Sequence, residues 1–309
     1  MIDFRDFICI FDLEVDIPRN YREQLYASGR NLLLKFNHMI EITKDRYNIT
    51  LSDLAVNFHV SMKQLRNWRT GKTPIPLRIL NILAELGGIN DKFIETEIDW
   101  ISSSRGIQTK IPRRVSPLLI EILGRFSGDG SCGNYDGDYK WSLKEEGKRF
   151  VRLNSRDMQT IFGNGGIYID YCTYAENLIR SKALVLLFQQ LFEYTDDFDK
   201  TYDISPPYFI DQINWNHRKF FTTGLIDTEG SFYYSNQTYY FELHMVNLSL
   251  VDEVSNAFDE YRIPYNRKHT KSGNFKLISY GRDNCSLISD IFEIKNEKHL
   301  KKLIDWDIL

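Results

Sequence analysis

The sequence has little that would place the protein in a membrane or cross-link it covalently. No run of about 18 apolar residues occurs, which argues against a transmembrane helix. The amino terminus carries Asp3, Arg5 and Asp6 around a short apolar run, unlike a signal peptide. The four cysteines form no CxxC pair: Cys9, Cys132, Cys172 and Cys285. Scattered thiols favour a reduced, cytoplasmic protein without membrane partners over a disulfide framework or a zinc site.

An excess of positive charge is also missing. Lysine and arginine total 39 against 42 acidic residues, which gives a formal net charge of −3. Proteins that bind nucleic acid usually have a basic footprint, so this balance counts against tight non-specific binding but leaves room for a local basic face. The length of 309 residues predicts two or three domains, and a hydrophobic fraction of 42% is enough for ordinary packed cores.

What the sequence does have is an internal repeat. Residues 220–232 read as an amphipathic helix that ends at an acidic residue and a glycine and then turns into a strand. A weaker copy spans residues 120–131. Superposing the copies at an offset of 100 residues aligns Gly124 with Gly224, Asp129 with Glu229, and Gly130 with Gly230. A repeat of this size predicts two related half-domains.

The spacing within each copy suggests what the repeat is for. Gly124 and Gly128 lie four residues apart on one helical face, and small residues there let two helices approach closely. Asp129 and Glu229 would then lie together at helix carboxyl ends, where a cation is favoured. Adjacent carboxylates repel unless a metal neutralises them, and hard oxygen ligands suit Mg²⁺. Metal-assisted phosphodiester hydrolysis is the resulting hypothesis; the alternative for either copy is a glycine-capped helix ending in a solvated acid.

Residues Thr222–Gly230 resemble the nine-residue LAGLIDADG motif of the homing endonucleases, and Ile122–Gly130 resembles its partner. The resemblance covers roughly the last two thirds of the chain. It implies an α+β fold of two pseudo-symmetric αββαββα half-domains, residues 117–210 and 211–309, whose antiparallel sheets form a saddle over DNA. It also implies a single-chain monomer with Mg²⁺ as cofactor and Mn²⁺ as a substitute.

The same resemblance assigns site residues. Asp129 and Glu229, with Gly128 and Thr228 beside them, would hold the metal. A lysine after the last helix of each half would lie near the metal-bound water, and Lys200 and Lys295 fall there; a solvated lysine is the alternative. The first copy departs from the motif, because Ser127 replaces its first acid and Arg125 replaces an apolar residue.

Residues 1–100 are predicted to form a separate all-α domain with a long helix before residue 48. Residues 50–72 then read as two short helices joined by a tight turn, the second polar and basic. The stretch resembles phage-repressor-type helix-turn-helix domains, whose second helix lies in the major groove. That resemblance points five side chains at DNA: Lys63, Gln64, Arg66, Asn67 and Arg69. A small helical bundle with a solvated basic helix is the alternative.

Serine, glycine and proline punctuate residues 101–116, which reads as a linker. In the repeat, basic, amide and aromatic side chains on the predicted strands suit phosphates and base edges. The predicted DNA-binding residues of the two halves are Lys140, Lys144, Arg180, Tyr233, Gln237, Arg267, Lys268 and Lys276. The first half also carries acids that repel phosphate, so we expect the second half to contribute more of the binding energy.

The sequence therefore predicts a metal-dependent, site-specific endonuclease of double-stranded DNA with an added DNA-binding domain. Retention of both motif acids favours this enzyme. The acidic net charge and the added amino-terminal domain favour a non-cleaving descendant, either a DNA-binding transcriptional regulator or a splicing helper whose partner is RNA.

Overall fold

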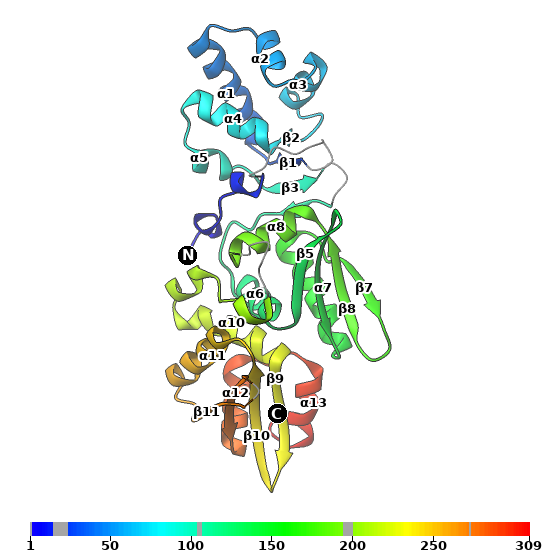
Figure 1. Cartoon of the computed structure of the whole chain (residues 1–309), viewed down its shortest axis with the longest axis vertical. Coiled ribbons are helices and arrows are strands. Elements are labelled where there is room, and N and C mark those ends of the chain that lie inside the picture. The colour runs from blue at the N-terminus through cyan, green and yellow to red at the C-terminus, as the bar shows by residue number, and fades with distance from the viewer. Residues whose placement is uncertain (1, 15–23, 104–106, 194–199, 272) are drawn as a thin grey trace. The chain divides into compact units, whose positions relative to one another are not determined.

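The computed structural model describes residues 2–14, 24–103, 107–193, 200–271 and 273–309 (Figure 1). It mixes helices with three antiparallel sheets, each of four strands. Two compact units are present. The first contains residues 1–114 with 162–164 and 180–187, and the second contains residues 115–161, 165–179 and 188–309. Both repeat copies belong to the second unit.

The first unit combines short helices with a small sheet. Two 3₁₀ helices, η1 and η2, open it, and five α-helices and four strands follow. Their bounds are η1 Phe4–Phe7, η2 Phe11–Glu14, β1 Leu25–Ser28, α1 Leu32–Tyr47, α2 Leu51–Asn57, α3 Met62–Arg69, β2 Ile75–Pro76, α4 Leu77–Gly87, α5 Asp91–Glu95, β3 Trp100–Ser103 and β4 Thr109–Lys110.

The two short helices predicted near residues 50–72 are present, and their starts follow from capping chemistry. Thr50 caps α2 in a capping box with Asp53, and Ser61 caps α3 in a second box with Gln64. Residues 58–61 turn the chain between them, with His59 at φ 53°. The predicted core positions Leu54, Leu65 and Trp68 are buried.

The prediction of an all-α amino-terminal domain is wrong. Strands β1 to β4 form an antiparallel sheet in the order β2-β1-β3-β4. Leu25, assigned to the long helix, lies in β1 instead. The segment 101–116, expected to be a linker, supplies most of β3 and all of β4, of which β3 pairs with β1. Strands of two to four residues are too short to show a period-2 pattern in the sequence.

The second unit is organised around two helices, α6 (Pro117–Asp129) and α10 (Trp215–Glu229), which pack against each other. Ser116 caps α6 ahead of Pro117, as the sequence predicts. The helices cross with backbones in contact: a Cβ on Gly124 would lie 2.1 Å from the Phe221 carbonyl oxygen, and one on Gly224 would lie 2.3 Å from that of Glu121. The small residues of the repeat are therefore required by this crossing.

After each central helix the chain runs through two strands, a helix, two strands and a helix. The first set is β5 Gly130–Tyr135, β6 Asp138–Glu145, α7 Lys148–Phe162, β7 Ile167–Asp170, β8 Ala175–Arg180 and α8 Lys182–Leu191, followed by α9 Lys200–Asp203 and the 3₁₀ helix η3 Tyr208–Gln212. The second is β9 Gly230–Ser235, β10 Thr238–Met245, α11 Leu248–Glu260, β11 Asn266–His269, β12 Phe275–Tyr280 and α12 Arg282–Phe292, followed by α13 Glu297–Asp305. The sheet orders are β5-β6-β8-β7 and β9-β10-β12-β11.

Two details of the predicted element order need correction. The alternating residues 167–174 predict a single strand, but β7 ends at Asp170 and the chain turns at Cys172, where φ is 71°, before β8 begins. Helix α13 was not predicted, because its apolar positions are few between lysines. The second difference bears on the site, since α13 carries one of its lysines.

Each sheet of the second unit has one face against helices. Trp141 of β6 packs on Phe126 and Phe188, and Phe241 of β10 packs on Phe232 and Phe258. All four cysteines are free thiols. Within the described ranges, no helix combines the length and the apolar character needed to cross a membrane.

Candidate active site

The two acids of the repeat end the two central helices. Asp129 is the last residue of α6 and Glu229 the last of α10, and Gly130 and Gly230 continue directly into strands with extended backbone. Glycine is needed there for space and not for a left-handed turn, because a Cβ on Gly130 would lie 2.6 Å from Cα of Phe126. The sharp change from helix to strand leaves both carboxylates at the same end of the helix pair.

The structure brings Asp129 and Glu229 together. A Cβ on Gly128 would lie 2.1 Å from Oγ1 of Thr228 and 3.0 Å from Cγ of Glu229. Both acids are half-buried. Burial, with the negative charges of Glu229 and Glu145, raises the pKa of Asp129 to about 8. Burial also raises the pKa of Glu229, while Lys200 and Lys298 act in the opposite direction.

A third carboxylate, Glu145, joins this pair and was missed by the sequence analysis. It ends β6 and is buried, and it shares a hydrogen bond with Asp129. The sequence pattern indicates only its burial, because Glu145 continues the alternation of buried Trp141 and Leu143 on the helix-facing side of the strand. The corresponding residue of β10 is Met245, so the two halves differ here.

Two lysines reach the carboxyl ends of the central helices. Lys200 Nζ donates to the carbonyl oxygen of Gly128. Lys298 Nζ, from α13, donates to the carbonyl oxygen of Thr228 at 3.2 Å and to Oε2 of Glu145 at 2.9 Å. Burial lowers the pKa of Lys200 to about 8, against the opposing charges of Glu229 and Asp129. Each central helix end therefore has one acid and one lysine.

Lys200 reaches the carboxyl end of α6, whereas Lys295 does not reach the corresponding end of α10. Nζ of Lys295 pairs with Oε2 of Glu121 in the middle of α6, and Lys298 lies in the position that corresponds to Lys200. Helix α13 has no clear pattern in the sequence, and it places Lys298, three residues after Lys295, at this position.

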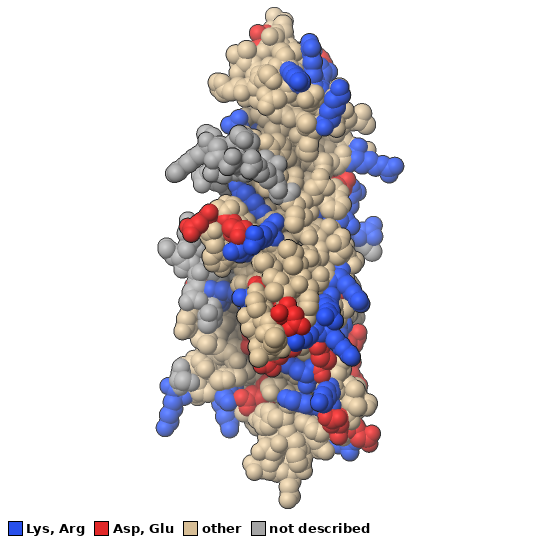
Figure 2. Space-filling view, turned by 90° about the vertical axis from the view of Figure 1, so that its right-hand side faces the viewer, with Lys and Arg blue, Asp and Glu red and all other residues tan. Residues whose placement is uncertain are grey.

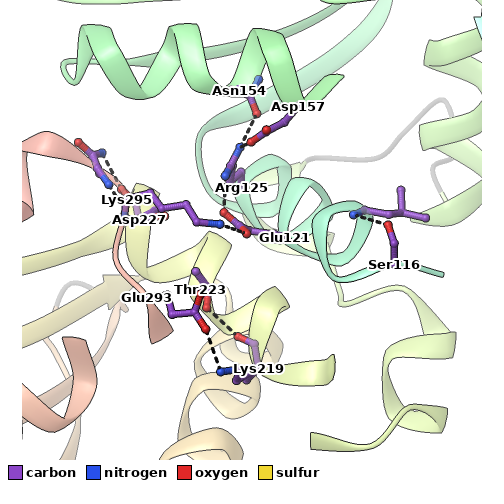
Figure 3. Close-up of polar contacts among 12 residues, drawn as sticks. Ser116, Glu121, Arg125, Asn154, Asp157, Lys219, Thr223, Asp227, Glu293 and Lys295 are labelled. Atoms are coloured by element: carbon purple, nitrogen blue, oxygen red, sulfur yellow. Dashed lines mark hydrogen bonds and ion pairs between the residues drawn. The ribbon is translucent and has the colours of Figure 1, made fainter. Parts of the chain in front are cut away.

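Glu121 belongs to a buried charge network that explains the unusual Arg125 of the first motif (Figure 3). The Arg125 guanidinium is fully buried between Glu121 and Asp157, 2.6 Å from Oδ2 of the latter. The negative charges of those two carboxylates raise the pKa of Arg125 despite its burial. The corresponding residues of the second half are Phe221, Leu225 and Ala257, all buried.

A cavity of about 240 Å³ opens beside Lys200 and Glu229. Ser127 and Gly128 of α6 line it, with His244 and Met245 from the end of β10. Lys200 and Glu229 therefore both line the same open cavity.

The donors at this site fit a hard divalent cation. Two carboxylates, Asp129 and Glu229, and two main-chain carbonyls, of Gly128 and Thr228, offer only oxygen. Burial and, after it, repulsion by Glu229 raise the pKa of Asp129, and a bound cation would oppose both effects. In the part of the chain that the structure describes, no group of three or more His, Cys, Asp or Glu side chains is placed to hold a metal ion.

The predicted DNA-binding residues of the second half divide between the two faces of their sheet. Tyr233, Lys268 and Lys276 share the face turned away from the helices, as the strand register shows. Tyr233 stacks on Tyr240, and Lys276 pairs with Glu242 at 2.6 Å. Arg267 lies on the opposite face, paired with Asp252 of α11, and Gln237 lies in the β9–β10 turn at φ 59°.

In the first half, Lys140 and Lys144 occupy the face of β6 turned away from the helices. Lys140 pairs with Asp138 at 3.1 Å, and Lys144 lies 3.8 Å from Glu176. Arg180 ends β8 and is exposed. Figure 2 shows basic and acidic side chains interleaved on the surface it presents, in line with the net charge of −3.

Helix α3 was predicted to lie in the major groove with five side chains directed at DNA, and fewer of these side chains are exposed without an intramolecular partner than expected. Lys63 and Arg66 are exposed. Arg69 instead binds back to α1, donating to Oδ1 of Asn37 at 2.9 Å and to Oε1 of Glu41 at 3.1 Å. Gln64 is engaged in the capping box with Ser61. Asn67 is half-buried.

Comparison with known proteins gives matches only among solved structures. No family model matches the sequence. No curated protein matches it either. The fold resembles the homing endonuclease I-DmoI, in a complex with DNA and Mn, at TM-score 0.43 and 17% identity over 59% of this chain and 99% of that one. It resembles I-SmaMI bound to an uncleaved DNA target with calcium ions at TM-score 0.44 and 13% identity, over 63% and 90%. I-WcaI bound to its DNA recognition sequence matches at TM-score 0.41 and 11% identity, over 57% and 80%.

Proposed function

We propose that the protein is a site-specific endonuclease of double-stranded DNA that depends on a divalent metal ion. The observation that carries the proposal is the joint end of α6 and α10, where Asp129 and Glu229 lie together with a lysine at each helix terminus. Two carboxylates at one end of two crossing helices repel each other, and a shared divalent cation would offset that repulsion. The repeated element order supports two pseudo-symmetric half-domains around this site.

The roles of the residues follow from their chemistry. Asp129 and Glu229, with the carbonyls of Gly128 and Thr228, would hold Mg²⁺ or Mn²⁺. The bound cation would supply a water of lowered pKa and neutralise charge on the phosphate. Lys200 and Lys298 would orient water and stabilise the charge that develops on the phosphate oxygens. Glu145 would share a hydrogen bond with Asp129 and hold Lys298 in place.

DNA would lie across the sheet faces turned away from the helices. Tyr233, Lys268 and Lys276 would contact it in the second half, and Lys140, Lys144 and Arg180 in the first. Ion pairs such as that between Lys276 and Glu242 would exchange for phosphate contacts. Lys63 and Arg66 of α3 would add a second contact with the same duplex, as a helix-turn-helix reader.

The second candidate function is a regulator that binds DNA without cutting it. The interleaved acidic side chains and the lysines that occupy the Gly128 and Thr228 carbonyls favour it. A splicing helper that binds RNA shares these features. Either protein would keep the fold and the DNA-facing or RNA-facing surface without turnover.

One experiment separates these functions. Random duplexes retained by the protein in Ca²⁺ are sequenced, and Mg²⁺ is then added to the complexes. The nuclease cuts both strands of a defined target with a short stagger, because its two acids serve one strand each. A regulator leaves the selected duplex intact in Mg²⁺ and in Mn²⁺ at every pH tried, and a splicing helper selects no duplex but retains structured RNA.

A further inference from the structure

The start of helix α13 is fastened to the central helices by a set of hydrogen bonds that no role described above uses. Oδ1 of Asp227, two residues before Glu229, accepts from the backbone N–H groups of Lys295 and Asn296, each at 2.9 Å. The Asn296 side chain donates back to the Asp227 carbonyl oxygen at 2.7 Å. Asp227 is fully buried and Asn296 likewise. The last turn of α10 thus hydrogen-bonds to Lys295 and Asn296, which directly precede α13.

The hydrogen bonds from Asp227 and Asn296 continue into α13, the helix that carries Lys298. Asn296 is the N-cap of α13, and its Oδ1 accepts from the backbone N–H of Lys298 at 3.1 Å. A capped first turn fixes the direction in which a helix leaves its start. Nζ of Lys298 then reaches the Thr228 carbonyl oxygen and Glu145. Asp227 is therefore connected to Lys298 in two steps, through its hydrogen bonds with Asn296 and through the hydrogen bond between Asn296 and Lys298.

A second anchor holds the same segment from the other central helix. The Lys295 side chain ends on Glu121 of α6, inside the network with Arg125 (Figure 3). Its backbone N–H is held by Asp227 of α10. Residues 295–296 are consequently tied to both helices whose ends form the site.

We propose that Asp227 and Asn296 are positioning residues, which fix the first turn of α13 so that Lys298 is held at the carboxyl end of α10. The inference rests on the proposed nuclease function for its catalytic consequence. Lysine has a long, flexible side chain, so a small shift of its helix would lower the fraction of molecules with the ammonium in place.

The device belongs to the second half alone among the described residues. Ser127 occupies the position that corresponds to Asp227, and its hydroxyl donates to the Leu123 carbonyl oxygen of its own helix at 3.0 Å. Lys200 is the first residue of the four-residue helix α9. Loss of the Asp227 hydrogen bonds should therefore slow the strand that depends on Lys298 and spare the strand that depends on Lys200.

The experiment uses a duplex labelled differently on its two strands, cut under single-turnover conditions by the full-length protein. Lys298→Met and Lys200→Met first identify which strand each lysine serves. Asp227→Leu should then slow the Lys298-dependent strand roughly tenfold to a hundredfold, as a misplaced catalytic group does. The other strand and the affinity for DNA in Ca²⁺ should be unchanged. Asp227→Asn keeps the accepting Oδ1 and should restore most of the rate.

Two further variants guard against a folding defect. Asn296→Ser keeps a good helix cap but loses the donor to the Asp227 carbonyl, so it should give a smaller loss on the same strand. Ser255→Ala removes a buried hydroxyl that donates to the Val251 carbonyl oxygen and bonds to Tyr265, away from α13, and should change neither strand. Equal slowing of both strands by Asp227→Leu and Asn296→Ser, or no slowing of either, overturns the proposal.

A readout without DNA separates this inference from the proposed function. Amide hydrogen exchange of residues 295–300 should be faster in Asp227→Leu and Asn296→Ser than in the wild type. Acetylation of Lys298 by acetic anhydride should be faster too. If the wild type never cuts DNA but exchange and acetylation are faster in the variants, the nuclease function is refuted while the role of Asp227 and Asn296 in fixing α13 is supported. If exchange and acetylation are unchanged, that role itself is refuted.

Discussion

A Cβ placed on Gly224 would lie 2.3 Å from the carbonyl oxygen of Glu121, closer than real atoms approach. This contact sets the distance between the two central helices and therefore between the acids at their ends. The same close approach occurs at Gly124, where a Cβ would meet the Phe221 carbonyl oxygen. Each helix therefore requires a glycine where the backbone of the other passes.

The first prediction follows from that contact. Gly224→Ala should lower the free energy of unfolding by roughly 1–3 kcal/mol, because overpacking forces the helices apart. Helix propensity alone predicts the opposite sign, a gain of up to about 1 kcal/mol for alanine in a helix interior. Urea denaturation decides between them. Gly133→Ala, where an added Cβ would meet only ordinary contacts at 3.4 Å, is the matched control.

The second prediction concerns the buried charges of α6. Arg125→Met should destabilise the protein by roughly 3–5 kcal/mol, since it leaves Glu121 and Asp157 without a buried cation. Replacing all three by the residues of the second half, Glu121→Phe, Arg125→Leu and Asp157→Ala together, should cost less than Arg125→Met alone. A triple variant less stable than the single one would contradict this reading of the network.

The third prediction is a dependence of stability on pH through His299. Burial, helped by the charges of Lys298 and Lys302, lowers the pKa of His299 to about 3. The unfolded chain binds a proton near the ordinary value of 6.5 while the folded protein does not. The stability that neutral His299 contributes is thus complete above pH 6.5 and is lost as the pH falls from 6.5 towards 3, by up to about 1.4 kcal/mol per pH unit.

His299→Leu tests this directly, because its ring packs on Phe232 and needs an apolar replacement of similar size. The difference in unfolding free energy between variant and wild type should shift in favour of the variant as the pH falls from 7 to 5. A difference that stays constant across that range would show that His299 does not titrate on unfolding.

The fourth prediction concerns helix α3. Lys63→Ala with Arg66→Ala should weaken binding to selected DNA and reduce the salt slope by close to two, because each lost phosphate contact removes about 0.9. Arg69→Ala should leave that slope unchanged, since Arg69 is paired with Glu41 and Asn37. An unchanged slope in the double variant would mean that this helix does not contact DNA.

Much of the second unit could be predicted from the sequence. The repeat at 120–131 and 220–232 located both central helices and the two acids, because close crossing demands small residues at fixed spacing. The residue types also predicted the helix caps at Thr50 and Ser116.

The remainder depended on tertiary contacts. Lys298 and Glu145 come to the site from α13 and from the end of β6, so their nearness to Asp129 has no local signal. Arg125 departs from the motif in the sequence, and Asp157, the partner that explains it, comes from another helix. The strands of the first unit were too short to leave a pattern, and α13 looked polar because its lysines cover a narrow apolar stripe.

The measurement that tests the central claim most directly is Mg²⁺-triggered cleavage of a pre-bound complex by wild type and by Asp129→Asn. Both proteins are loaded on a selected duplex in Ca²⁺, and Mg²⁺ is added. The site described here predicts that the wild type cuts both strands while Asp129→Asn binds with similar affinity and leaves the duplex intact. A wild type that holds its target uncut in Mg²⁺, or an Asp129→Asn that cuts as fast as the wild type, would contradict it.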